Sequence, residues 1–137
     1  MRRTPWPSLV FAGCVLAAAS ARAEDAVDCA NAMSTADLNT CGSQALDVAD
    51  AELNRVYKKI LADFAGPDDG NEDNNKKWAE ALRVSQRAWV AFRDADCEKL
   101  MIFEGGGGSM TTGAVLGCMT ELTEARTKDL KARYEIP

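Results

Sequence analysis

The sequence has 137 residues, with 16 basic and 21 acidic side chains and no histidine. Lack of histidine excludes Ser-His-Asp and Cys-His catalytic arrangements and histidine metal sites. The excess of acidic residues argues against nucleic acid and anionic membranes as partners and favours a basic protein or a cation. Solubility of a secreted protein would account for the same composition.

The first 23 residues have the organisation of a signal peptide. Arg2 and Arg3 precede an apolar stretch from Leu9 to Ala19, and Ala21-Arg22-Ala23 supplies the small residues at which signal peptidase cleaves. The apolar stretch is about eleven residues long, well short of the roughly 20 that cross a bilayer. We therefore expect cleavage after Ala23, export to the periplasm or the medium, and no membrane span.

An alternative interpretation is a lipoprotein anchored at Cys14. The segment Phe11-Ala12-Gly13-Cys14 resembles a lipobox, but Phe stands where Leu is usual, and the apolar run continues to the better cleavage site. Cleavage after Ala23 leaves residues 24–137 as a single domain with 13 basic and 21 acidic side chains. We expect this domain to be a monomer.

The first predicted helix starts at Ser34, after a short leader. Ser34 and Asp37 resemble a capping box, with Asp in place of the usual Glu or Gln. Gly66-Pro67 ends the helix, because proline cannot continue the hydrogen-bond ladder. One apolar stripe with three- and four-residue steps runs along this helix and comprises Leu38, Cys41, Ala45, Ala49, Leu53, Val56, Ile60 and Phe64.

The segment from Asp68 to Asn75 is acidic and turn-rich, and we expect an exposed loop there. A second helix is predicted from about Lys76 to Phe103. Its expected inward stripe consists of Trp78, Leu82, Ser85, Trp89, Phe92 and Asp96, flanked by Ala81, Ala88, Ala91 and Ala95. Small alanines beside large aromatic residues are typical of close helix packing.

Gly105 to Gly108 must end the second helix, because four consecutive glycines lose too much backbone entropy to remain helical. A third helix is expected from Thr111 or Thr112 to about Tyr134. No alternating strand pattern appears after the signal peptide. The predicted fold is therefore all-α, with three main helices in antiparallel succession and sequence neighbours packed together.

Four cysteines remain after processing, namely Cys29, Cys41, Cys97 and Cys118. Their even number in an exported domain indicates disulfides, for which three connectivities are possible. Cys97 near the end of the second helix and Cys118 early in the third meet across an antiparallel hairpin, so we predict Cys97–Cys118 and Cys29–Cys41. Zinc binding is disfavoured, because no pair has CxxC spacing and histidine is missing.

The sequence offers little for catalysis. A pair of carboxylates, as in glycoside hydrolases, is the remaining enzymatic hypothesis, but the acidic residues lie on predicted solvated faces and loops. The glycine run does not fit a phosphate-binding loop, and Asp68, Asp69, Glu72 and Asp73 lack the alternating ligands of a calcium loop. We expect no cofactor, no metal and no enzymatic activity.

Polar residues beside the apolar stripes predict a partly buried hydrogen-bond network. Asn54, Gln86, Arg93 and Arg126 lie next to the inward stripes of the three helices, and Gln86 and Arg93 flank Trp89. Such a network would fix the register of the helices, and we favour this structural role over ligand binding.

Three blocks in order resemble the LprI-type lysozyme inhibitor family of small exported bacterial domains. The first is Cys41 followed by residues 49–57, which include Asp50, Leu53, Asn54 and Tyr57. The second is residues 85–97, and the third is Gly107-Gly108-Ser109 ahead of Cys118, Thr123, Arg126 and Leu130. The resemblance runs from Cys29 to Tyr134 and implies a disulfide-bonded helical domain of the cell envelope that inhibits lysozyme.

Two functional hypotheses follow. As an inhibitor, the acidic chain would be steered to a basic lysozyme, with contacts from the acidic loop (Asp68, Asp69, Glu72, Asp73) or from the glycine loop (Glu104, Ser109). As a non-catalytic envelope interaction module, it would bind another protein through an exposed apolar patch containing residues such as Trp78, Met101, Ile102 or Phe103.

Overall fold

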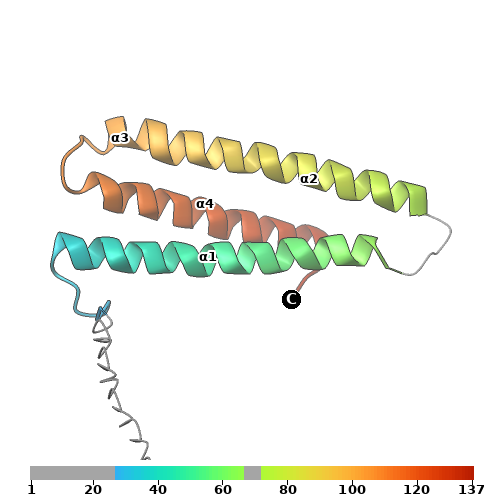
Figure 1. The fold of residues 1–137 in the computed structure, drawn as a ribbon, viewed down its shortest axis with the longest axis horizontal. Helices are drawn as coiled ribbons and strands as arrows, with labels where there is room; N and C mark the ends of the chain where they lie inside the picture. The colour runs from blue at the N-terminus through green and yellow to red at the C-terminus, as the bar shows by residue number, and fades with distance from the viewer. Residues whose placement is uncertain (1–26, 67–71) are drawn as a thin grey trace, which may run out of the picture.

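The computed structural model describes residues 27–66 and 72–137 and shows an all-helical fold. Helix α1 spans Thr35–Phe64, α2 spans Glu72–Ala95, and α4 spans Thr111–Tyr134. A π-helical segment, η1, at Asp96–Leu100 and a single turn, α3, at Met101–Glu104 extend α2. In Figure 1 α2 runs antiparallel to both α1 and α4, which confirms the predicted topology, and the described ranges contain no strand.

The signal peptide prediction falls on residues outside these described ranges. Within the ranges, no helix is both long enough and apolar enough to cross a membrane.

Helix α1 begins where the capping residue was predicted. The Ser34 hydroxyl oxygen accepts a hydrogen bond from the Asp37 backbone N–H at 3.0 Å, and the Ser34 hydroxyl donates to the Asp37 carboxylate at 2.7 Å. Ala49, Leu53, Val56 and Ile60 are buried, so the central and C-terminal parts of the predicted stripe face the core. The N-terminal part does not, since Leu38 is 45% exposed.

Helix α2 differs from the prediction in its start and in its inward face. It begins at Glu72, so residues 72–75 form its first turn, where Glu72 and Asp73 face the positive end of the helix dipole. The buried positions are Ala79, Leu82 and Arg93, followed by Cys97 in η1. Leu82 and the partly buried Trp89 confirm part of the predicted stripe. Arg93 faces inward although it is charged, so a periodicity counted on apolar residues alone placed the inward face partly wrong. The exposed positions include Trp78, Ser85, Phe92 and all four flanking alanines, Ala81, Ala88, Ala91 and Ala95.

Helices α1 and α4, the first and last long helices of the chain, approach each other closely. A Cβ atom at Gly42 would lie 3.2 Å from Leu116 Cδ1, a tighter distance than most real Cβ contacts. Lys131 of α4 also pairs with Glu52 of α1 at 2.7 Å. Contact between the first and last long helices therefore adds to the predicted contacts between sequence neighbours.

The apolar core lies in one half of the bundle. Its buried members come from all three long helices and the C-terminal segment, namely Leu53, Val56, Ile60, Leu82, Leu130 and Ile136. At the end of this half the Phe64 ring stacks on Trp78 with centroids 4.8 Å apart and meets Tyr134 edge-on at 5.8 Å. We call residues 51–66, 72–88 and 124–137 the core half.

The other half, residues 27–50 and 89–123, contains both disulfides, and we call it the disulfide half. Cys29 is bonded to Cys41 and Cys97 to Cys118, with Cα–Cα distances of 5.6 Å in both pairs. This connectivity confirms the predicted pairing. The buried residues of this half are small or polar, and include Ala49, Cys97 and Thr123.

Candidate functional site

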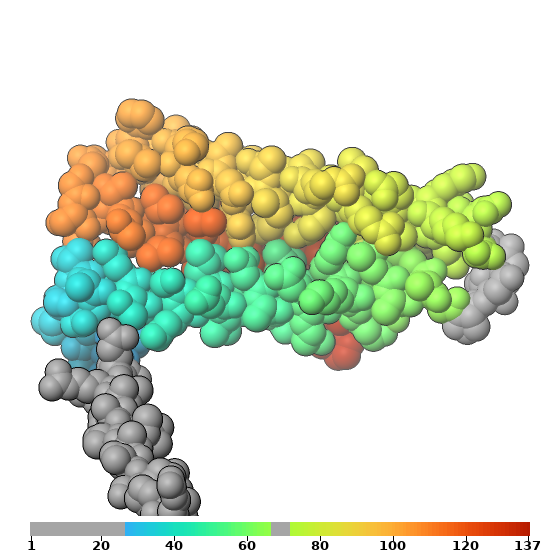
Figure 2. Space-filling model, viewed as in Figure 1, coloured from blue at the N-terminus to red at the C-terminus, as the bar shows by residue number. Residues whose placement is uncertain are grey.

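A groove between α1 and α2 is lined mainly by residues of the first two sequence blocks. Its cavity has a volume of about 430 Å³. Figure 2 shows atoms of α4 between the surfaces of α1 and α2. Helix α1 contributes Asp50, Leu53, Asn54 and Tyr57, and α2 contributes Arg83, Gln86, Arg87, Trp89, Val90 and Arg93.

Arg93 connects all three long helices at the middle of the bundle. Its side chain is 10% exposed and donates to the Asp50 carboxylate of α1 at 2.8 Å and to the Thr123 hydroxyl of α4 at 2.9 Å. A further bond reaches Asp94 at 3.1 Å. A buried guanidinium is tolerated when it is paired and hydrogen-bonded in this way. The contacts with Asp50 and Thr123 therefore fix the levels of these two residues relative to Arg93.

Trp89 lies beside two arginines from different helices. The Arg93 guanidinium carbon is 5.3 Å from the Trp89 ring centroid, and that of Arg126 is 6.0 Å away, within cation–π range. Arg126 also donates from α4 to the Gln86 side-chain oxygen at 3.1 Å and to Ser85 at 3.2 Å. Gln86 and Trp89 are thereby connected to α4 as well as to the groove.

Asn54 is exposed on the groove wall, outside the hydrogen bonds of Arg93 and Arg126. Asp50 is the one acidic side chain among the described residues that line the groove, and it is paired with Arg93. A glycosidase requires two carboxylates separated by roughly 5 to 9.5 Å around its substrate. The groove therefore lacks the carboxylate pair that such a reaction needs.

Glu52 forms a surface ion-pair network that joins α1 to α4. Arg55 donates two hydrogen bonds to the Glu52 carboxylate, at 2.7 and 2.8 Å, and Lys131 pairs with it at 2.7 Å. Hydrogen bonds from Arg55, and then from Lys131, lower the pKa of Glu52 to about 2. The ordinary value is 4.5, so the carboxylate stays ionised in moderately acidic solution.

The described part of the acidic segment, residues 72–75, and the glycine loop lie at opposite ends of the molecule (Figure 1). Asp68 and Asp69 fall outside the described residues. Glu72 and Asp73 are exposed in the first turn of α2, and hydrogen bonding to Lys76 lowers the pKa of Glu72. Glu104 ends α3, and Ser109 follows the glycines; both are exposed at the disulfide end.

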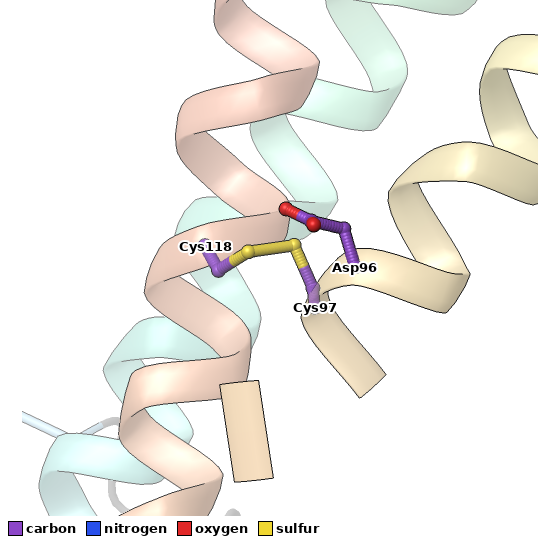
Figure 3. Close-up of side chains that lie close together, drawn as sticks. All are labelled: Asp96, Cys97 and Cys118. Atoms are coloured by element: carbon purple, nitrogen blue, oxygen red, sulfur yellow. A yellow bond between two sulfur atoms is a disulfide. The ribbon is translucent and has the colours of Figure 1, made fainter. Parts of the chain in front are cut away.

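Asp96 lies close to the Cys97–Cys118 disulfide (Figure 3), with one carboxylate oxygen and both sulfur atoms within 4.8 Å of one another. Because both sulfur atoms are bonded to each other, neither is available as a thiolate ligand for a metal. A single carboxylate does not make a metal site. The cluster is therefore a disulfide with an acidic neighbour.

Comparison with known proteins places these residues in a family. The family described as "Lysozyme inhibitor LprI" matches residues 28–130, which include both disulfides and every groove residue. The chain is 41% identical over 136 residues to the uncharacterized protein R02472 of Rhizobium meliloti, covering 97% of this chain and 96% of that protein. It is 29% identical over 98 residues to the uncharacterized protein YecT of Escherichia coli, covering 69% and 60%. No solved structure matches.

Proposed function

Since the chain belongs to the LprI lysozyme inhibitor family, we propose that it is an exported protein that inhibits a lysozyme by binding it. The observation that carries the proposal is the family match over residues 28–130. The family description names an inhibitor and not a catalyst, and the groove has no carboxylate pair. Both findings are consistent with a protein that binds lysozyme and catalyses no reaction.

Export is part of the proposal. Residues 1–23 have signal-peptide organisation, and cleavage after Ala23 would release residues 24–137, with a lipid anchor on Cys14 as the alternative. Two disulfides suit an oxidising compartment such as the periplasm or the extracellular medium. Inhibitor and lysozyme would then meet outside the cytoplasm.

Charge supports a basic lysozyme as the target. Residues 24–137 contain 13 basic and 21 acidic side chains, and lysozymes are commonly basic proteins. Opposite net charges accelerate association, with a rate that falls as salt rises. The contact would involve the acidic segment that includes Glu72 and Asp73, or the glycine loop between Glu104 and Ser109.

We assign the groove residues a structural role in this function. Arg93 donates hydrogen bonds to Asp50 and Thr123, and Arg126 donates to Gln86 and Ser85. These bonds hold α2 against α1 and α4. A network of this kind specifies the helix register on which the positions of the loops depend.

The experiment is a cell-wall lysis assay with oxidised protein, residues 24–137, and several lysozymes at low and high salt. An unrelated acidic protein of equal net charge serves as the control. We expect inhibition that rises with dose, exceeds that of the control, and weakens as salt increases. Failure to inhibit any of the lysozymes would refute the proposal.

The second candidate is a non-catalytic envelope interaction module. Phe103 is 82% exposed and Ile102 is 42% exposed, as expected for a protein-binding patch. This candidate gains support if the purified protein leaves lysozyme fully active and yet binds another envelope protein through Phe103.

A further inference from the structure

Apolar side chains flank the glycine loop at the end of the disulfide half. Leu100 is 48% exposed, Phe103 82% and Met110 62%, and Ile102 lies between them in the sequence at 42%. We call these four residues the apolar tip. Leaving large apolar side chains in water is unfavourable, and contact with a partner removes that cost.

The tip belongs to a strongly asymmetric distribution of apolar surface. Of the ten large hydrophobic side chains that are exposed among the described residues, eight lie in the disulfide half. The core half has two, Trp78 and Val84, and the Trp78 ring is stacked on Phe64. Concentration in one half of the molecule distinguishes this surface from the scattered apolar residues of an ordinary monomer.

Charge is segregated along the same axis. Residues 27–50 contain four acidic side chains and no basic one, and residues 89–123 contain five acidic and two basic ones. The disulfide half thus carries nine acidic against two basic side chains. The core half carries eight acidic against eleven basic ones. Asp68 and Asp69, which lie in the sequence between the first two segments of the core half, reduce its excess to one basic side chain. The apolar tip is therefore at the strongly negative end of a molecule whose other end is nearly neutral.

We propose that the apolar tip and the acidic surface around it are the face that docks on a basic lysozyme. The inference rests on the proposed function and adds the orientation of the complex. A basic partner attracts the disulfide half far more strongly than the nearly neutral core half, so the inhibitor arrives end-on, with the tip leading. Apolar contact at the centre and complementary charge around it is the usual arrangement of a specific interface.

The glycine loop suits this leading position. Gly106, Gly107 and Gly108 have φ of 72°, 74° and 84°, in the region that glycine adopts without strain. A Cβ atom on any of the three would meet nothing within 4 Å, so open space surrounds this stretch of backbone. A slender loop without side chains can enter the substrate cleft of a lysozyme, where a bulkier one would clash.

The test compares variants that make the same change of charge, or remove one exposed apolar side chain, in the two halves. The tip variants are Glu98→Gln/Glu104→Gln and, separately, Phe103→Ser. Their controls in the core half are Glu80→Gln/Glu135→Gln and Val84→Ser, all at exposed positions. Binding of oxidised protein to a basic animal lysozyme is measured by calorimetry at low and high salt, alongside inhibition of lysis, and circular dichroism checks that each variant is folded.

We expect Glu98→Gln/Glu104→Gln to weaken binding about tenfold at low salt and less at high salt. Phe103→Ser should weaken it about tenfold at both salt concentrations, because the lost contact is apolar. Both controls should stay within about twofold of the wild type.

The remaining outcomes separate the two proposals. Wild-type binding that survives both tip changes, or that is lost instead on Glu72→Gln/Asp73→Asn, would overturn the docking face and leave inhibition standing. A wild type that binds no lysozyme would overturn the proposed function and the docking face together. Light scattering that shows dimers dissociated by Phe103→Ser would assign the tip to a second copy of the chain and overturn the docking face.

Discussion

In the core half, apolar side chains from α1, α2 and α4 meet, and Val56, Ile60 and Leu130 are at most 1% exposed. In the disulfide half the same helices bury Cys97 and Thr123, and eight large apolar side chains remain exposed. In the disulfide half, where large apolar side chains are exposed, disulfide bonds thus provide the stabilisation that hydrophobic burial provides in the core half. The difference shows how a small domain can keep one end free for a partner without unfolding there.

The largest effect is expected from removing core volume. Leu130→Ala leaves a cavity at a fully buried position and should lower the free energy of unfolding by about 3.5 kcal/mol. Guanidinium denaturation of the oxidised protein measures this loss. Leu38→Ala, at a position 45% exposed in the disulfide half, is the control and should cost less than about 1 kcal/mol. Equal losses for the two variants would contradict the division into halves.

Removing the Cys97–Cys118 disulfide is expected to cost slightly less. Cys97→Ala/Cys118→Ala opens a closed loop of 21 residues, which the chain-entropy model values at about 3 kcal/mol. Amide exchange should accelerate between Asp96 and Cys118 and remain slow around Val56 and Leu130. An unchanged melting temperature would show that the disulfide does not stabilise this end.

The next effect concerns the junction of the halves. Arg93→Met removes the bonds to Asp50 and Thr123 and leaves the buried Thr123 hydroxyl without this donor. We expect a loss of about 2 kcal/mol, together with a changed near-ultraviolet circular dichroism signal from Trp89. Arg87→Met is the control, since Arg87 is exposed and pairs with Glu80, and it should cost under about 1 kcal/mol.

The smallest effect is a dependence on pH at the α1–α4 contact. The folded-state pKa of Glu52 is about 2, below its ordinary 4.5, so its ion pairs stabilise the fold above pH 4.5 and lose their effect as pH falls towards 2. The stability difference between wild type and Glu52→Gln should therefore be present at pH 6 and vanish near pH 2. A stability difference between wild type and Glu52→Gln that grew as pH fell would contradict this prediction.

Local signals in the sequence predicted much of the fold. The Ser34 cap, the end of the first helix shortly before Gly66 and the glycine run depend on a few neighbouring residues, and each appears in the structure where expected. The predicted cysteine pairing is also found. The π-helical segment Asp96–Leu100 was not predicted, because its extra residue per turn has no comparable composition signal.

The groove was harder to predict than the helices. Its members from α1 and α2 are distant in sequence, and their convergence depends on an inward face of α2 that includes the charged Arg93. The periodicity of apolar residues cannot identify such a face, because the buried charge of Arg93 is tolerated only through its hydrogen-bond partners on other helices. The charge asymmetry between the two halves could have been predicted from the sequence, because a count of charges over residues 27–50 reveals it once the midpoints of the helices are known.

The pairing of α1 with α4 governs the order in which the chain can fold. A chain that emerges from a ribosome or translocation channel exposes α1 first, and the partner that covers Val56 and Ile60 contains Leu130, near the opposite terminus. Contacts so distant in sequence cannot form until nearly all residues are free. The first part of the chain therefore stays unfolded while it emerges, and the native structure forms only when α4 is available.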